Sequence, residues 1–195
     1  LKNIERLFNE GFRMMSLQHF FDNKLGGSLH GISGNGLTQF GQEAIQEMLR
    51  LGIMIDVSHS SENVVKDVLN LSDQPILVSH TGFNGHCPSS RNISDSLMKE
   101  IAKKDGLVAV GFWHAAVCNN TPQSVAEAIQ YGIELIGAKH VALGSDFDGA
   151  VRPGFDTSEL VAITHELLEA GVKESEIRLV MGENMLNFLK KNLAD

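Results

Sequence analysis

The sequence has few cysteines and no long apolar run, and these two shortages exclude several classes of protein. Its two cysteines, Cys87 and Cys118, are too few for a disulfide framework and are not spaced like those of a zinc knuckle. They leave open one bridge in an exported protein or buried thiols in a cytoplasmic one. No apolar run approaches the roughly 18 residues that cross a bilayer, so we expect no membrane-spanning segment. No signal peptide is visible.

Positive charge is also scarce, because 16 lysines and arginines stand against 24 aspartates and glutamates, for a net charge of −8. Nucleic acids and anionic membrane surfaces bind basic patches, and none is visible, so we expect neither partner. A hydrophobic content of 43% over 195 residues provides for one sizeable core, and we expect a single domain over 1–195. The chain starts at Leu1 instead of methionine, so we expect its natural beginning to be missing.

Two short apolar runs, 53–57 and 76–78, lead into the same Val-Ser-His ending and place a histidine at His59 and at His80. A helical pattern over 62–71 lies between them. Continuous apolar runs joined through a helix are typical of a parallel βαβ unit that is buried on both faces. The two histidines should then lie side by side at the carboxyl edge of the strands, where ligands gather in α/β folds.

The same alternation extends along the chain and predicts an α/β fold. Five strands are expected to end near residues 19, 59, 80, 113 and 146. Helices are expected over 4–11, 37–51, 62–71, 94–104, 121–136, 158–170 and 174–193. Because a helix or a loop leading to one follows each strand, the economical arrangement is a parallel sheet. Five strands cannot close a barrel that needs about eight, so the sheet is either open or part of a larger barrel.

Two further stretches have a clear local interpretation. The glycine-rich stretch 26–36 is expected to be a flexible surface loop. The helix over 37–51 is amphipathic, and the residues on its apolar face are Phe40, Ala44, Ile45, Met48 and Leu49.

Polar side chains gather where the predicted strands end. They are His19, His59, His80 and Asp146, with Arg91 in the loop that follows the third strand. Taken singly, each residue also has a structural interpretation as a loop, turn-capping or surface residue. Taken together, they favour a metal-dependent hydrolase, because imidazoles bind zinc, zinc acidifies bound water, and a guanidinium matches a substrate carboxylate. For the other histidines, a structural role is expected: His30, His86, His114, His140 and His165.

Several motifs make this prediction specific. The runs GLTQFGQEAIQEMLRLGIMIDVSHSS, PILVSHTG, CPSSRNISD, LGSDFDG and GENML occur in this order over essentially the whole chain. They closely resemble the membrane (renal) dipeptidase family of metallopeptidases. The resemblance implies a (β/α)₈ barrel with two zinc ions that hydrolyses dipeptides, including some with a D-residue at the C-terminal side; some members act on β-lactams. This chain would supply the C-terminal five βα units of a partial metallo-dependent hydrolase barrel.

The resemblance also implies a role for each strand-end residue. His59 and His80 match the two histidines that ligate one zinc ion. His19 matches a histidine that contacts the substrate and stabilises the tetrahedral intermediate. Arg91 matches the arginine that holds the dipeptide carboxylate, and Asp146 matches the acid that handles the proton of the attacking water.

The chain departs from the family pattern in ways that limit this carry-over. The family carries a His-x-Asp pair and a metal-bridging glutamate in an N-terminal barrel segment that has no counterpart here. Leu49 and Asn187 stand where asparagine and arginine are usual, on helices. Cys87 and Cys118 fall where mammalian members place a disulfide, which favours export.

The resulting expectation is a zinc-dependent dipeptidase acting through a metal-bound hydroxide. This chain would supply half of the metal site and the substrate-binding residues, and would be inactive by itself. Its expected partners are a dipeptide substrate and the missing N-terminal segment, and a homodimer stays open. The alternatives are a non-catalytic truncated barrel or scaffold, and an amidohydrolase that acts on another amide or a lactam.

Overall fold

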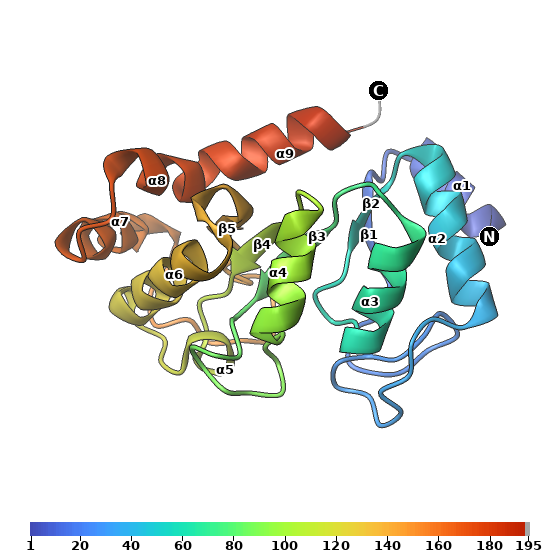
Figure 1. Cartoon of the computed structure of the whole chain (residues 1–195), viewed down its shortest axis with the longest axis horizontal. Coiled ribbons are helices and arrows are strands. Elements are labelled where there is room, and N and C mark those ends of the chain that lie inside the picture. Colours follow the sequence, from blue (N-terminus) through green and yellow to red (C-terminus); the bar gives the residue numbers. More distant parts are fainter. Residues whose placement is uncertain (194–195) are drawn as a thin grey trace.

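A parallel five-stranded sheet forms the centre of the molecule, which is described by a computed structural model over residues 1–193 (Figure 1). The strand order follows the sequence, and all four neighbouring pairs are parallel, as the βα alternation predicts. The strands are β1 (Met14–Ser16), β2 (Met54–Asp56), β3 (Leu77–Thr81), β4 (Leu107–Val110) and β5 (Val141–Leu143).

Helices join consecutive strands and continue after the last one. They are α1 (Lys2–Asn9), α2 (Gln39–Leu51), α3 (Glu62–Leu71), α4 (Asp95–Lys103), α5 (His114–Val117), α6 (Pro122–Ile136), α7 (Val161–Glu169), α8 (Glu174–Arg178) and α9 (Asn184–Asn192). Short 3₁₀ turns cover Ala138–His140 and Thr157–Glu159, and a π-helical turn covers Leu179–Glu183. No helix within residues 1–193 has both the length and the apolar character needed to cross a membrane.

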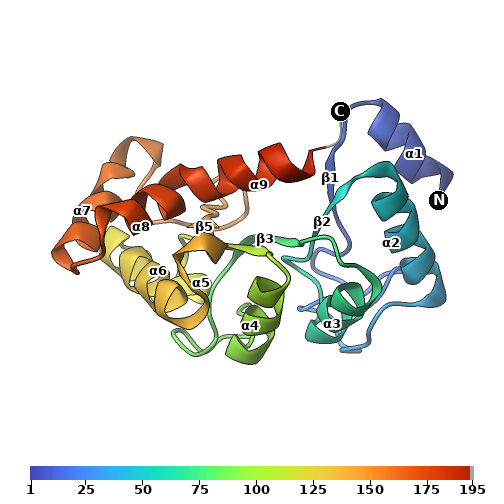
Figure 2. The same cartoon turned by 45° about the horizontal axis from the view of Figure 1, so that its top comes forward.

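β2 and β4 are buried on both faces, whereas the edge strand β1 is partly exposed, and the period of two along each strand decides which side chains face which layer. Ile55, Val78 and Val108 belong to the larger core, whereas their neighbours Met54 and Leu77 belong to a smaller cluster with Phe188 of α9. Figure 2 shows α9 on one side of the sheet and α3, α4 and α6 on the other. The expectation that the runs 53–57 and 76–78 are buried on both faces is confirmed.

Local capping explains where several helices begin. The hydroxyl of Thr38 accepts a hydrogen bond from the Gly41 N–H at 3.0 Å, and Ser61 caps α3 in the same way. Thr121 caps α6, whose first residue is Pro122. α2 ends at Gly52, whose positive φ of 72° suits glycine. The helices expected over 37–51 and 121–136 are confirmed, although α2 begins two residues later than expected, at Gln39.

Two helix expectations were wrong. Phe40 is 43% exposed, because the buried face of α2 passes through Gly41, Ala44, Ile45 and Met48 instead. A Cβ atom on Gly41 would lie 2.0 Å from the Leu25 carbonyl oxygen, so the loop backbone packs directly on this helix without a side chain between them.

The expected helix over 174–193 is also interrupted. It forms α8, then the π-helical turn, then α9, with non-helical backbone angles at Gly182. Glycine favours such a break because holding its flexible backbone in a helix costs more conformational entropy than it does for other residues. The break redirects the chain so that α9 lies over the sheet.

The stretch 26–36 is a loop with exposed residues at 30 and 32–35, as expected, but its start is buried and anchored. Gly26, Gly27 and Ser28 are buried, and Ser28 forms a β-bridge with Ser60 beside the end of β2. The Asp22 carboxylate accepts backbone hydrogen bonds from Ser28 and from the 32–33 turn. These hydrogen bonds hold the loop against the carboxyl edge of the sheet.

Candidate functional site

The carboxyl ends of the strands surround a cavity of about 640 Å³. All five residues singled out from the sequence line it: His19, His59, His80, Arg91 and Asp146. The parallel sheet brings them together because the carboxyl ends of its strands lie at one edge.

His59 and His80 form the centre of the cavity. Their Nε2 atoms lie 3.0 Å apart, and their ring centroids lie 4.9 Å apart. Burial, with the positive charge of Arg91 as the next cause, lowers the pKa of His59 to about 3. The pKa of His80 is lowered by the same two causes. Both imidazoles are therefore neutral near pH 7, which leaves a lone pair on each ring for a ligand.

His19 lies beside this pair, with its ring centroid 4.5 Å from that of His59. It follows β1, as the position of the first predicted strand indicates. The ring of Phe20 packs edge-on against His19 at 4.2 Å. His19 therefore extends the aromatic wall of the cavity from His59 and His80 toward the loop that follows β1.

His30, for which a structural role is expected, also lines the cavity. Its ring centroid lies 5.6 Å from that of His59 and 5.4 Å from that of Phe20. Burial lowers its pKa, and the charge of Arg91 lowers it further. Asp22 was a sequence signal for an ordered loop, because its carboxylate accepts hydrogen bonds from nearby backbone N–H groups. The bridge from Ser28 to Ser60, which holds this loop beside the cavity, joins residues far apart in the sequence and could not be found from a local pattern.

Arg91 is only 5% exposed, which excludes the interpretation as a surface charge. Its Nη1 donates to the Ser58 carbonyl at 2.8 Å, and its Nη2 donates to the His80 carbonyl at 2.7 Å. The guanidinium carbon lies 5.4 Å from the centroid of the Trp113 ring. Burial lowers the pKa of Arg91 to about 10, so the group remains charged near pH 7. The cavity thus contains a fixed positive charge.

Asp146 lies in the turn after β5 with a positive φ of 59°, a conformation that aspartate tolerates better than most residues. Its carbonyl accepts a hydrogen bond from the Gly149 N–H at 2.9 Å. The negative charge of Asp146 acts on Arg91 and His80, opposing the fall in the pKa of each. The carboxylate therefore lies within electrostatic reach of both groups across the cavity.

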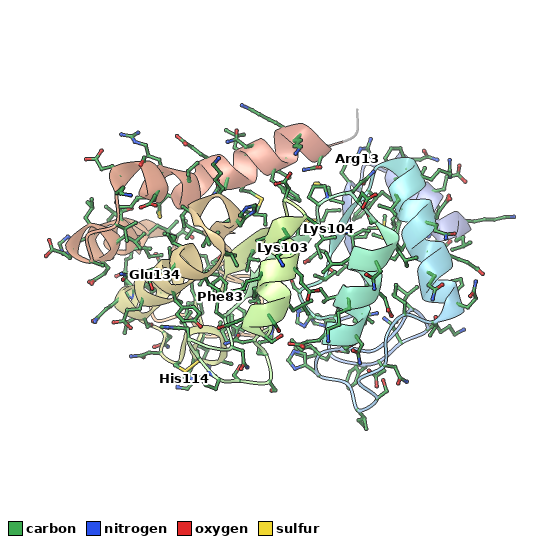
Figure 3. All side chains as sticks on the ribbon, in the orientation of Figure 1. Arg13, Phe83, Lys103, Lys104, His114 and Glu134 are labelled. Atoms are coloured by element: carbon green, nitrogen blue, oxygen red, sulfur yellow. A yellow bond between two sulfur atoms is a disulfide. The ribbon has the colours of Figure 1, made fainter. Side chains whose placement is uncertain are left out.

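The loop that carries Arg91 is held in place by a disulfide and by a buried aromatic side chain. Cys87 is bonded to Cys118, with their Cα atoms 5.4 Å apart, so the loop after β3 is tied to the segment after α5. Phe83, labelled in Figure 3, is fully buried and lies 5.9 Å from the Tyr131 ring of α6. These contacts hold the guanidinium against the cavity wall.

A divalent metal such as Zn²⁺ fits the chemistry of the donors in this cavity, although not their number. Two neutral imidazoles converge through their Nε2 atoms, and the buried Nδ1 of His59 has no hydrogen-bond partner in the described part of the chain. Catalytic zinc usually has three protein ligands. Residues 1–193 contain no group of three or more histidine, cysteine or acidic side chains placed to hold a metal. The described residues therefore bring together two imidazoles of the kind that bind zinc, without a third ligand beside them.

The chain belongs to the membrane dipeptidase family, peptidase family M19, whose model matches residues 1–194. It is 34% identical over 202 aligned residues to dipeptidase aclJ from Aspergillus oryzae, with 96% of this chain aligned. Among solved structures, it is 27% identical to a metallopeptidase described as dipeptidase AC, with a TM-score of 0.90 over the whole chain. A metallopeptidase from Rhodobacter sphaeroides, liganded with a phosphinate mimic of the dipeptide L-Ala-D-Ala, is 27% identical over 98% of this chain, with a TM-score of 0.86.

These relatives are considerably longer than the chain. It spans 47% of the Aspergillus oryzae protein, about half, and 60% and 59% of the two solved chains. The parallel α/β sheet thus matches part of a larger fold. The fold class expected from the resemblance, five βα units of a barrel, is confirmed.

Proposed function

We propose that this chain forms the C-terminal part of a zinc-dependent dipeptidase and supplies two metal ligands together with the substrate-binding residues. The observation that supports this most is the convergence of two neutral imidazoles, the buried His59 and the partly buried His80, in one cavity with a buried guanidinium. The combination suits a small substrate that has both a bond to be polarised and a free carboxylate.

His59 and His80 would hold the metal through their Nε2 atoms. When bound, the metal acidifies a water molecule and polarises the carbonyl of the scissile peptide bond. Because burial lowers the pKa of both histidines, their lone pairs are available near pH 7. The two side chains therefore suit metal binding more than proton transfer.

The remaining side chains would act on the dipeptide itself. Arg91 binds the terminal carboxylate, because two of its N–H groups are used by main-chain carbonyls and the rigid fork still lines the cavity. His19 donates a hydrogen bond to the oxyanion that develops on the attacked carbonyl. Asp146 takes the proton of the attacking water and delivers it to the leaving amine.

The first substrate pair to test is L-Ala-D-Ala and L-Ala-L-Ala, because the Rhodobacter sphaeroides relative was solved with a mimic of the former. Purified full-length protein with added zinc should release alanine from at least one of them, and a chelator should abolish the reaction. Zinc binding without release from either dipeptide would contradict dipeptidase activity. A follow-up panel of amides and lactams would then distinguish an amidohydrolase from a non-catalytic scaffold.

A further inference from the structure

Asp56 is a buried carboxylate that connects the ends of three strands behind His59 and His80. It is 3% exposed and belongs to β2. Its Oδ1 accepts hydrogen bonds from the Ser58 and Ser79 backbone N–H groups, both at 3.1 Å, and from the Ser58 hydroxyl at 2.6 Å. Its Oδ2 accepts from the hydroxyls of Ser79 at 2.7 Å and Ser16 at 3.1 Å. These hydrogen bonds stabilise the ionised carboxylate in a buried place.

The sheet register explains why these side chains meet. Ser16 of β1 is the direct partner of Asp56, and Asp56 is the direct partner of Leu77 in β3. Ser79 lies two residues beyond Leu77 and therefore points to the same face of the sheet. On this face, the side chains at the start of the strands are apolar, and those at the carboxyl ends, Ser16, Asp56 and Ser79, are polar and lie next to the cavity.

Ser79 connects Asp56 to His80, and the single proton of its hydroxyl decides the tautomer of the imidazole. The hydroxyl oxygen lies 2.7 Å from Asp56 Oδ2 and 2.8 Å from His80 Nδ1. A hydrogen bond to an ionised acceptor is roughly twice as strong as one to a neutral acceptor, so the proton goes to Asp56. The oxygen of Ser79 must then accept a proton from Nδ1 of His80.

The nearby hydroxyl of Ser58 does not change this assignment. It lies 2.9 Å from the Ser79 hydroxyl, but its own proton has the closer ionised acceptor, Asp56 Oδ1, at 2.6 Å. The oxygen of Ser58 also accepts the backbone N–H of His80 at 3.2 Å. Both hydroxyls therefore donate to the carboxylate and accept from His80.

We propose that Asp56 and Ser79 form a positioning pair that holds His80 as its Nδ1–H tautomer, with the Nε2 lone pair directed into the cavity. The inference rests on the proposed function, in which His80 binds a metal through Nε2. A hydrogen bond from the second ring nitrogen orients a metal-ligating histidine and raises its basicity. Neither Asp56 nor Ser79 need touch the substrate.

His59 and His80 differ in whether their second ring nitrogen, Nδ1, has a hydrogen-bond partner. The Nδ1 of His80 has the Ser79 hydroxyl as its partner, whereas the buried Nδ1 of His59 has none among residues 1–193. His80 is therefore the histidine whose ring this chain orients by itself. A change at Ser79 should act on metal binding through His80 alone.

The proposal is tested by NMR on zinc-free, full-length protein with ¹⁵N-labelled histidine. Two-bond proton–nitrogen correlations distinguish the two tautomers, and a His80→Asn variant assigns the signal. The wild type should show His80 protonated on Nδ1, and Ser79→Ala should lose that preference. Ser79→Ala should also weaken zinc binding by about tenfold or more, the usual cost of losing such a partner.

Ser16→Ala is the matched control, because it removes one hydrogen bond to Asp56 without touching His80. It should leave both the tautomer and the zinc affinity unchanged, and circular dichroism verifies that both variants fold. Wild-type His80 protonated on Nε2, or unchanged zinc affinity in Ser79→Ala, would overturn the pair. Failure to hydrolyse any dipeptide, with the expected tautomer intact, would overturn the proposed function and leave the positioning pair supported.

Discussion

Arg91 combines two roles that can be separated by experiment. It joins the ends of β2 and β3 by donating to the carbonyls of Ser58 and His80, and it presents a charge to the cavity. The structural role depends only on the N–H groups of Arg91 that donate to these two backbone carbonyls. The second depends on a planar charged fork that a carboxylate can match.

Arg91→Ala should raise KM and lower kcat/KM for dipeptides by roughly ten- to a hundredfold, the cost of a charged hydrogen-bonded contact. Steady-state kinetics on a dipeptide and on its C-terminal amide provide the measurement. The loss should be large for the free carboxylate and small for the amide, which lacks the group that Arg91 binds. An equal loss for both substrates would show that the residue acts through the backbone alone.

The buried histidines make the stability of the metal-free protein dependent on pH. Burial lowers the pKa of His59 to about 3, whereas a histidine in an unfolded chain titrates near 6.5. Between these values the unfolded state binds the extra proton, so stability falls as the pH drops below about 6.5. The slope for one such group approaches about 1.4 kcal/mol per pH unit, and above that range the contribution is constant.

Urea unfolding of chelator-treated protein at several pH values between about 5 and 7.5 measures this dependence. His59→Asn should show a shallower fall in the free energy of unfolding toward acid than the wild type. His80, whose pKa is also lowered by burial, remains in both proteins, so both curves keep a fall toward acid. Parallel curves for the two proteins would show that His59 titrates normally in the folded state.

The loops after β3 and β4 depend on one another for their positions. The disulfide between Cys87 and Cys118 joins them, the Ser89 hydroxyl donates to the Ala115 carbonyl at 2.7 Å, and the Asn92 amide donates to the Cys87 and Ala116 carbonyls. Because the side chains of Arg91 and Trp113 extend from these segments, their alignment decides the shape of one cavity wall.

Replacing Cys87 and Cys118 together by alanine should lower the free energy of unfolding by about 3–4 kcal/mol. The bond closes a loop with a sequence separation of 31 residues, and the chain-entropy account assigns that amount to such a loop. Urea denaturation of the double variant provides the measurement. The wild type under reducing conditions should unfold at the same urea concentration as the variant. A wild type that keeps its stability after complete reduction would contradict the prediction.

Local patterns predicted the strands and helices because those features depend on nearby residues. Apolar runs end at polar residues before His59 and His80, and the helices expected over 37–51 and 121–136 form with Thr38 and Thr121 as their N-caps. The position of His30 depends on the pairing of Ser28 with Ser60, which are far apart in the sequence.

The polar network behind the site likewise required the structure. The contact between Asp56 and Ser16 follows from the register of two strands, and Ser79 reaches both Asp56 and His80 because β3 lies beside β2. The exposure of Phe40 had a similar cause, since the backbone at Leu25 occupies the place of a buried side chain beside Gly41. A residue pattern does not include such contacts between distant segments.

The sheet as a whole has two edges, because β1 and β5 each pair with a single neighbour among the described strands. In a closed barrel, strands would lie beyond both edges and bring further residues to the carboxyl side. The chain has five of the roughly eight strands of such a barrel, and it covers a similar share, 60% and 59%, of two solved relatives. We therefore expect the ligands that accompany His59 and His80 to come from outside these residues.

This expectation predicts a large difference in zinc affinity between two polypeptides. Shared over four ligands, the roughly 10–16 kcal/mol of a structural zinc site amounts to about 3 kcal/mol per ligand, or roughly a hundredfold in affinity. A polypeptide limited to residues 1–195 should bind zinc at least that much more weakly than one extended by an N-terminal barrel segment, and should not hydrolyse dipeptides. Competition with a chelator of known affinity provides the measurement, with His59→Asn/His80→Asn as the control for binding elsewhere. Tight zinc binding and turnover by the shorter polypeptide would show that two histidines and their surroundings suffice.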